Sequence, residues 1–369
     1  MLTTQNTERS LVSTLLEQLR ETLRALPDVQ ELQTEHEAPA AADRPARYDA
    51  RIDLRVADKP LVLLIAAKKL IYPRDARQAL WQLQALNFPA TQNQGAEQLP
   101  LLIAESISPG AKEFLQRERV GYYDSGGSLF LPAKGAYLYV DKPPPKPMAR
   151  AIQSLYSGRR AQVLHALLNQ HDAWVGVKAL AAEAHVSPTT ASQVLTALDR
   201  LDWLESQGQG PTKKRHLREP AALLDAWSRQ IATERPPALR RFYVPTLRGD
   251  ALADRVGEVL GYKEAEYALT HEAAAQRYAP FLSSVLHVRC RVIPGRAADE
   301  ALSILRAQPV TEGANLSLID AKPPGELLFR QKVGEVWLAS PIQVYLDLLR
   351  GEGRAKEMAA HLRRERIGF

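Results

Sequence analysis

The chain has 369 residues, 45% of them hydrophobic, so it can bury more than one core. At about 150 residues per domain, this length predicts two or three domains. Its one cysteine, Cys290, excludes an intramolecular disulfide framework and fits a reducing compartment, and we expect it in a core. No apolar run approaches the roughly 20 residues of a membrane helix, and the first thirty residues contain no signal-peptide hydrophobic stretch, so we expect a cytoplasmic protein without a membrane partner.

The positive charge is unevenly distributed along the chain. The net charge at neutral pH is +6, and residues 142–220 contain 11 lysines and arginines but 6 acidic residues. Less than a quarter of the chain therefore carries most of the excess. A basic region of this kind indicates a polyanionic partner such as nucleic acid, although a run of cations is often only a solvated surface.

Two proline-rich stretches divide the sequence into three segments. "DKPPPKP" at 141–147 and "ERPPALRRFYVP" at 234–245 have the composition of extended, semi-rigid linkers. They predict domains at 1–145, 148–230 and 235–369. The sequence contains no internal repeat of the solenoid or propeller kind.

The first segment predicts an α/β domain. Leucines at helical spacing in "LVSTLLEQLRETLRAL" (11–26) indicate a helix with one buried face. The alternating "RYDARIDLRV" (47–56) indicates a half-buried strand, and the continuously apolar "LVLLIAA" (61–67) indicates a central strand covered on both faces. The elements expected after these are a helix at 73–86, a buried strand at 99–106, a helix at 108–119 and three strands between 120 and 140. This order is typical of an α/β domain.

The middle segment predicts a helix-turn-helix. Its first two helices are indicated by apolar residues at 163, 164, 167 and 168 and by Leu180, Ala181 and Ala184. In the turn that follows, Ser187 is a natural N-cap and Pro188 takes the first position of a third helix. The polar residues that this third helix exposes near its start are Thr189, Thr190, Ser192 and Gln193. Together with Ser187, these side chains are suited to contact base edges in the major groove.

A basic loop completes this pattern. "WLESQGQGPTKKRHLRE" (203–219) contains the glycines of a hairpin tip and the cations Lys213, Lys214 and Arg215, which would contact phosphates. The whole segment resembles a winged helix-turn-helix, because the order of its elements is that of this family. The resemblance implies binding to double-stranded DNA. The alternative is a small helical module for protein contact with a solvated loop.

The last segment mixes helices and strands and predicts an α+β domain. The expected helices are "GDALADRVGEVLG" (249–261), "PIQVYLDLLRG" (341–351) and "RAKEMAAHLRRER" (354–366). The expected strands are "HVRCRVI" (287–293), "GELLFRQKV" (325–333) and "EVWLAS" (335–340). Ser340 is expected to cap a helix that begins at Pro341.

The first segment also resembles the PD-(D/E)XK nuclease superfamily, which implies a restriction-endonuclease-like α/β domain. The stretch "YDARIDLRVADKPLVLLIAAKKL" places Asp53 on one strand and Lys68 at the end of the next, as in that family. The position two residues before Lys68, where the motif requires Asp or Glu, is Ala66. A hard dication needs more oxygen ligands than Asp53 alone supplies, so we expect no catalytic residue, no metal site and no cofactor. Asp53 and Lys68 are then remnants of a nuclease site, or an ordinary ion pair.

The end of the chain resembles AbiEi-like antitoxins of type IV toxin-antitoxin systems. The stretches that carry the resemblance are "GANLSL", "WLASPIQVYLDLL" and "GRAKEMAAHLR", and with the winged helix it spans roughly residues 150–369. It implies a transcriptional repressor of its own promoter, a nucleotidyltransferase-like toxin as partner and, by analogy with two-fold operators, a homodimer. Two other hypotheses remain: a DNA endonuclease targeted by the winged helix, and a protein-interaction module that neutralises a toxin by contact.

Overall fold

The computed structural model describes residues 2–26, 29–36, 48–56, 58–84, 96–134, 136–322 and 325–369. The chain is a mixed α/β protein. It divides into two compact units, one formed by the residues up to 152 with 197–202, and one formed by 153–196 with 203–369. No helix within the described ranges is long and apolar enough to cross a membrane.

Among its described residues, the first unit holds a seven-stranded sheet whose strands follow chain order. They are β1 (Val29–His36), β2 (Ala50–Val56), β3 (Lys59–Ile71), β4 (Glu97–Ile107), β5 (Gly121–Asp124), β6 (Leu129–Ala133) and β7 (Ala136–Val140). The pairs β3–β4 and β4–β5 are parallel, and the other neighbours are antiparallel. Helices α2 (Pro73–Gln84) and α3 (Pro109–Arg117) connect the parallel pairs, which need such crossovers.

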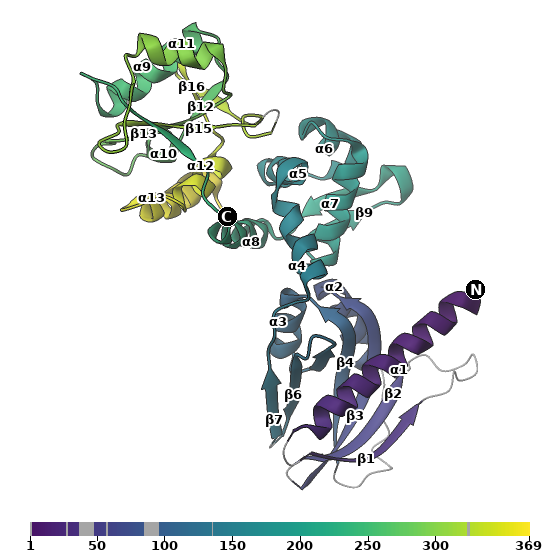
Figure 1. Ribbon diagram of the computed structural model, residues 1–369. Helices are drawn as coiled ribbons and strands as arrows, with labels where there is room; N and C mark the ends of the chain where they lie inside the picture. The colour runs from purple at the N-terminus through teal and green to yellow at the C-terminus, as the bar shows by residue number, and fades with distance from the viewer. Residues whose placement is uncertain are drawn as a thin grey trace. The chain divides into compact units, whose positions relative to one another are not determined.

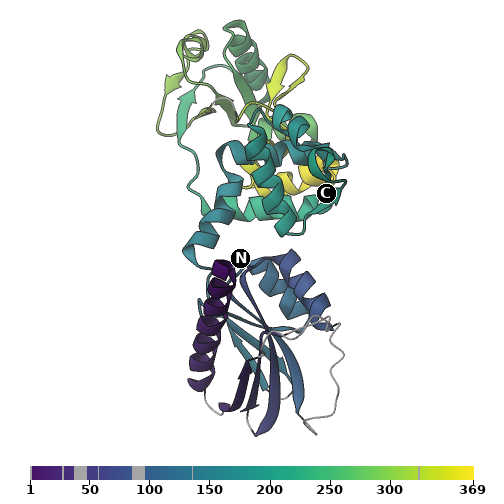
Figure 2. The same ribbon diagram turned by 90° about the vertical axis from the view of Figure 1, so that its right-hand side faces the viewer.

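This sheet is covered on both faces, which explains why β3 and β4 are apolar over most of their length (Figure 2). Helix α1 (Leu2–Arg24) lies across one face and buries Leu15, Leu16, Leu19 and Leu23. Helices α2 and α3 cover the other face and approach it closely through small residues such as Ala76. The predicted α/β arrangement of helices and strands is confirmed here.

A buried ion pair holds α3 against the sheet. Lys112 on α3 and Asp124 at the end of β5 lie 3.0 Å apart, and their side chains are 7% and 2% exposed. The Lys112 ammonium also donates to the Ser128 hydroxyl at 2.6 Å and to the Lys142 carbonyl at 3.1 Å. Because a buried charge without a partner is costly, this pair fixes α3, β5 and the chain that follows β7.

The second unit begins with a helical part that ends in a β-hairpin. After α4 (Lys146–Gln153) and a 3-10 turn (Ser154–Tyr156), its elements are α5 (Gly158–Asn169), β8 (Val175–Gly176), α6 (Val177–Glu183), α7 (Pro188–Arg200), β9 (Leu204–Gln207), β10 (Lys214–Leu217) and α8 (Pro220–Thr233). Of the strands described here, β8, β10 and β9 form a three-stranded antiparallel sheet with β10 in the middle. The predicted apolar faces of α5, α6 and α7 form the core between them.

The rest of the second unit is built around a mixed sheet, which in the described part of the chain has the order β14–β11–β15–β13–β12–β17–β16. The strands are β11 (Leu239–Tyr243), β12 (Tyr267–Thr270), β13 (Val288–Val292), β14 (Gln308–Pro309), β15 (Leu316–Asp320), β16 (Gln331–Val333) and β17 (Val336–Leu338). Cys290 lies on β13 and is fully buried, as expected, and burial raises the pKa of its thiol to about 12.

Helices cover both faces of this sheet (Figure 1). One face carries α9 (Gly249–Tyr262) and α11 (Arg296–Ile304), and the other carries α10 (His271–Tyr278), α12 (Pro341–Leu348) and α13 (Ala355–Leu362), which a π-helical turn (Arg363–Ile367) extends. Ser340 caps α12 by accepting a hydrogen bond from the Gln343 N–H at 3.1 Å, which confirms that prediction.

Three expectations about secondary structure need correction. β1 was not expected, because its sequence is almost entirely polar; an edge strand tolerates this composition. The stretch 234–245, expected to be a linker, contains β11, an interior strand between β14 and β15. The strand expected at 325–333 is reduced to β16, because residues 325–329 form turns.

A buried histidine joins the helical part of the second unit to the second sheet. His165 on α5 is 7% exposed, and its Nε2 lies 2.5 Å from the Ser340 hydroxyl at the start of α12. Its ring packs on Phe329 and edge-on against Trp227 of α8, with centroids 4.5 and 6.1 Å away. Burial lowers the pKa of His165 to about 3, so the ring is neutral at pH 7.

We predict that acid destabilises this contact. The unfolded chain takes up a proton at His165 below about pH 6.5, whereas the folded chain does so only near pH 3, so stability present above pH 6.5 is lost as the pH falls. The free energy of unfolding should fall by about 1.4 kcal/mol per pH unit on this account. In urea unfolding at about pH 7 and pH 5, His165→Phe should reduce this dependence and the exposed His185→Gln should keep it in full. Some dependence should remain in His165→Phe, because burial also lowers the pKa of His271, to about 4. Equal pH dependence in His165→Phe and the unmodified chain would contradict the prediction.

Candidate nucleic-acid interface

The start of α7 is fixed by local hydrogen bonds. Ser187 lies just before the helix, and its hydroxyl accepts a hydrogen bond from the Thr190 N–H at 3.2 Å. The Ser187 and Thr190 hydroxyls are also 3.0 Å apart. Pro188 takes the first helical position, where a backbone N–H would have no partner within the helix, so the lack of an N–H in proline costs no hydrogen bond. The predicted N-cap is therefore present, and it engages the side chain of Thr190 as well.

The outer face of α7 carries polar side chains and the inner face is apolar. Ala191, Val194, Leu195 and Leu198 are fully buried and hold the helix against α5 and α6. Of the predicted base-contacting residues, Ser187, Thr189 and Gln193 are exposed, whereas Thr190 and Ser192 are half-buried. Thr189 and Gln193 are four residues apart, so they share one face of the helix and form the most accessible polar pair.

Gln193 contacts a residue that the sequence did not indicate. Arg160, at the start of α5, donates to the Ser154 hydroxyl at 2.6 Å and to the Gln193 Oε1 at 3.4 Å. Because a guanidinium only donates, this contact uses the amide oxygen of Gln193 and leaves its NH₂ group as a donor. Nothing in the spacing of 160 and 193 could have revealed this pair, because it depends on how α5 and α7 cross.

The predicted basic loop is a hairpin whose tip needs glycine. Gly208 and Gly210 have φ angles of +78° and +57°, in the left-handed region that residues with a side chain rarely adopt. The strands on either side pair in register, with Lys214 opposite Gln207 and Leu217 opposite Leu204. The tip therefore follows from glycines at fixed positions, as expected from the sequence.

The three cations of the hairpin do not all lie on one side. Side chains alternate along a strand, so Lys214 and Arg215 point to opposite faces of β10. Lys214 is exposed, whereas Lys213 and Arg215 are half-buried. The Arg215 Nε is buried without a hydrogen-bond partner among the described residues. The exposed Trp174 stacks on His216 from the neighbouring β8 side, at a centroid distance of 5.4 Å.

The structure does not bring Asp53 and Lys68 together. Asp53 on β2 faces Val62 across the β2–β3 pair, and Lys68 lies six residues farther along β3, about 20 Å away at 3.3 Å per residue. Asp53 instead forms a bidentate ion pair with Arg51, at 2.7 and 2.9 Å. The expectation that Asp53 and Lys68 share a degenerate site is therefore wrong, because the turn between the strands sets a register that separates them.

The carboxylate next to Ala66 and Lys68 belongs to Asp49, which no sequence motif indicated. Asp49 accepts a hydrogen bond from the Ala67 N–H at 2.7 Å, and its own N–H donates to the Ile65 carbonyl. Counting the β2–β3 register back from the turn would have identified it. Within the described residues, no three His, Cys, Asp or Glu side chains are grouped so that they could hold a metal ion.

Comparison with known proteins gives no assignment. The chain matches no protein-family model, no curated protein sequence and no solved structure. Its function must therefore be argued from its own residues.

Proposed function

We propose that the protein is a sequence-specific, double-stranded-DNA-binding transcriptional regulator, in which residues 158–217 form a winged helix-turn-helix. One observation carries the proposal: a helix with an apolar inner face presents a polar N-terminal end, beside a glycine-tipped hairpin with three cations. A helix of 10–12 Å diameter fits the B-DNA major groove, which is about 12 Å wide.

The parts of this segment would act differently on DNA. The exposed Thr189 and Gln193 are suited to contact base edges, and the Gln193 amide oxygen also accepts a long hydrogen bond from Arg160. Ser187 and Thr190 would mainly stabilise the helix start, since their hydroxyls already bond each other and the backbone. The exposed Lys214 on the hairpin, with Lys213 before it, would contact phosphates, which supply affinity and not sequence discrimination. Arg215 points to the other face of β10.

The other parts of the chain complete the proposal. The first unit is suited to a restriction-endonuclease-like scaffold with Ala66 in place of a metal-binding acid, so we assign it no catalysis. The final residues resemble AbiEi-like antitoxins, and on that basis the regulator would repress its own promoter as a homodimer and have a nucleotidyltransferase-like toxin as partner. These assignments rest on the resemblance in sequence, whereas the DNA-binding proposal rests also on the geometry of α7 and the hairpin.

The deciding experiment is a DNA-binding assay in the presence of Mg²⁺. The full-length protein should shift labelled DNA from upstream of its own gene more strongly than scrambled DNA, and the DNA should stay intact on a denaturing gel. Cleavage that is lost in Asp49→Asn would show an endonuclease instead. No selective shift would overturn the proposal and favour a protein-contact module.

We predict that the hairpin lysines govern the salt dependence of DNA binding. Each neutralised phosphate contributes about 0.9 to the slope of log K against log salt. Replacing Lys213 and Lys214 together by Ala should flatten this slope by roughly 2 units and weaken binding to every DNA sequence. As a control, Lys332→Ala with Lys356→Ala removes the same charge from exposed positions elsewhere and should leave the slope unchanged. A slope that the hairpin variant does not alter would refute the phosphate role.

Gln193 should instead affect sequence discrimination. Gln193→Ala should cost about 1–3 kcal/mol on the specific site and little on scrambled DNA, as measured by fluorescence anisotropy. Ser187→Ala provides the contrast, because loss of the N-cap should destabilise α7 and weaken binding to both DNAs alike. Equal losses on both DNAs for Gln193→Ala would mean that this helix does not read bases.

A further inference from the structure

The second sheet forms the floor of a large cavity that the DNA-binding proposal does not use. The cavity has a volume of about 880 Å³ and lies on the face of the sheet that carries α10 and α12. It is within the range of small-molecule sites, roughly 300–1,000 Å³. The polar side chains that matter for its chemistry are Arg241, His271, His287, Arg289 and Ser317.

Three of these residues form a row across adjacent strands. Ser317 on β15 pairs in register with Arg241 on β11 on one side and with Arg289 on β13 on the other. Their side chains therefore point to the same face of the sheet at the same level. Strands are about 4.8 Å apart, so the Cα atoms of the two arginines are separated by roughly 10 Å with the serine between them. This spacing leaves room for an oxyanion between the two guanidinium groups.

The hydrogen bonds of the arginines leave donors free. Arg289 contacts Glu272 through its Nη1, at 2.9 and 3.1 Å. Arg241 donates to the Thr311 carbonyl at 3.4 Å, a long bond, and has no ion-pair partner among the described residues. Since a guanidinium has five N–H groups, each arginine keeps several donors. Both can bind a carboxylate or phosphate in addition to their present contacts.

The acidic residues around the cavity do not neutralise the free donors of Arg241 and Arg289. Asp347 is already bound by Arg291, at 2.6 and 2.9 Å, and by the Thr270 hydroxyl. Glu312 and Glu352 are exposed and belong to loops, not to the row on the sheet. The groups of the floor that still lack partners are therefore mainly hydrogen-bond donors.

Two histidines add further polar groups to the floor. His271 is 7% exposed, has a φ of +52° that is unusual for a residue with a side chain, and its Nδ1 has no partner within the described part of the chain. Burial, above all, lowers its pKa to about 4. His287 Nε2 lies 2.8 Å from the Ser317 hydroxyl. An unpartnered buried nitrogen in a strained residue is typical of a ligand site.

We propose that this cavity binds a small organic anion, with a phosphate or carboxylate group seated between Arg241 and Arg289. Ser317 between them is 1% exposed and holds His287. The volume exceeds what a single inorganic ion fills, so the ligand is of nucleotide or polycarboxylate size. His271 contacts the part of the ligand nearest α10. The proposal does not depend on DNA binding, because every group in it belongs to the second sheet and its helices.

The test is calorimetric titration of the full-length protein at low salt with ATP, citrate, inorganic phosphate and adenosine. We expect ATP or citrate to bind with a Kd below about 1 mM. Inorganic phosphate should bind more weakly, and adenosine should not bind. If ATP binds and citrate does not, the ligand carries a phosphate group. If citrate binds and ATP does not, the ligand carries a carboxylate group. If neither anion binds, or adenosine binds as well as ATP, the proposal is overturned.

Variants locate the binding. Arg241→Gln should weaken anion binding at least tenfold, because it removes a charged hydrogen-bond donor. Arg241 is exposed, so its replacement should leave the fold intact, which circular dichroism checks. Ser317→Ala should weaken anion binding to a smaller extent. Arg255→Gln on α9, at the opposite face of the sheet, should have no effect, and neither should the Lys213→Ala, Lys214→Ala pair on the hairpin. Unchanged affinity in Arg241→Gln, or a loss in the hairpin variant alone, would place the anion elsewhere and refute the site.

Discussion

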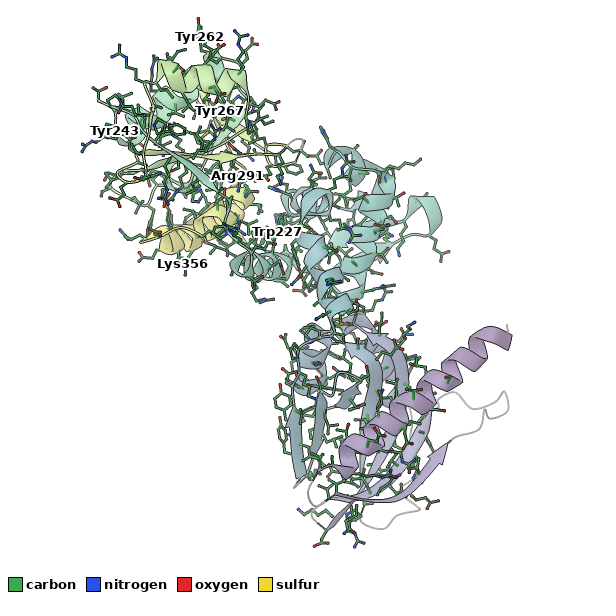
Figure 3. The ribbon with its side chains drawn as sticks, in the orientation of Figure 1. Trp227, Tyr243, Tyr262, Tyr267, Arg291 and Lys356 are labelled. Carbon is green, nitrogen blue, oxygen red and sulfur yellow. The ribbon has the colours of Figure 1, made fainter. Side chains whose placement is uncertain are left out.

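The second unit depends on the neutralisation of one buried carboxylate. Asp347 on α12 is 3% exposed. Arg291 on β13, which is labelled in Figure 3, donates to both of its oxygens. Burial alone would raise the pKa of Asp347, but the charge and hydrogen bonds of Arg291 outweigh it and hold the pKa at about 2. Either charge left without the other inside the protein would be strongly destabilising. The pair therefore fixes α12 on the sheet, and Thr270 at the end of β12 adds a third hydrogen bond.

The position of α12 in turn fixes the helical part of this unit. Ser340 at the start of α12 contacts the buried His165 of α5, and Trp227 of α8 packs on the same ring. Helix α5 is buried on the side that faces α12 and on the side that faces α7, so its core residues are inaccessible. Ser187, Thr189 and Gln193 at the start of α7 and Lys214 on the hairpin stay exposed. The Arg291–Asp347 ion pair and the His165–Ser340 contact therefore both hold α12.

The sequence was informative where structure is decided by neighbouring residues. Ser187 with Pro188 and Ser340 with Pro341 identified two helix starts correctly, because a cap involves residues three or four positions apart. The hairpin tip followed from its glycines. Pairings between distant residues could not be predicted in this way. Asp49, and not Asp53, lies beside Ala67, because the turn between β2 and β3 sets their register. A small shift in register changes which side chains lie opposite each other.

The same limit explains why the cavity could not be recognised from the sequence alone. Arg241, Ser317 and Arg289 come from three strands separated by up to 76 positions, and they form a row only because β11, β15 and β13 are neighbours in the sheet. In the sequence, 241 lies in a stretch with linker composition, and 289 is one of two arginines flanking the buried Cys290. Period-two alternation then separates their neighbours: Phe242 and Cys290 turn into the core on the other face, which leaves the arginines on the face with the cavity. In a sequence, such a site is therefore indicated by polar residues that alternate with buried ones along interior strands, and not only by polar residues at strand ends. This pattern identifies a site only when the order of the strands in the sheet is known.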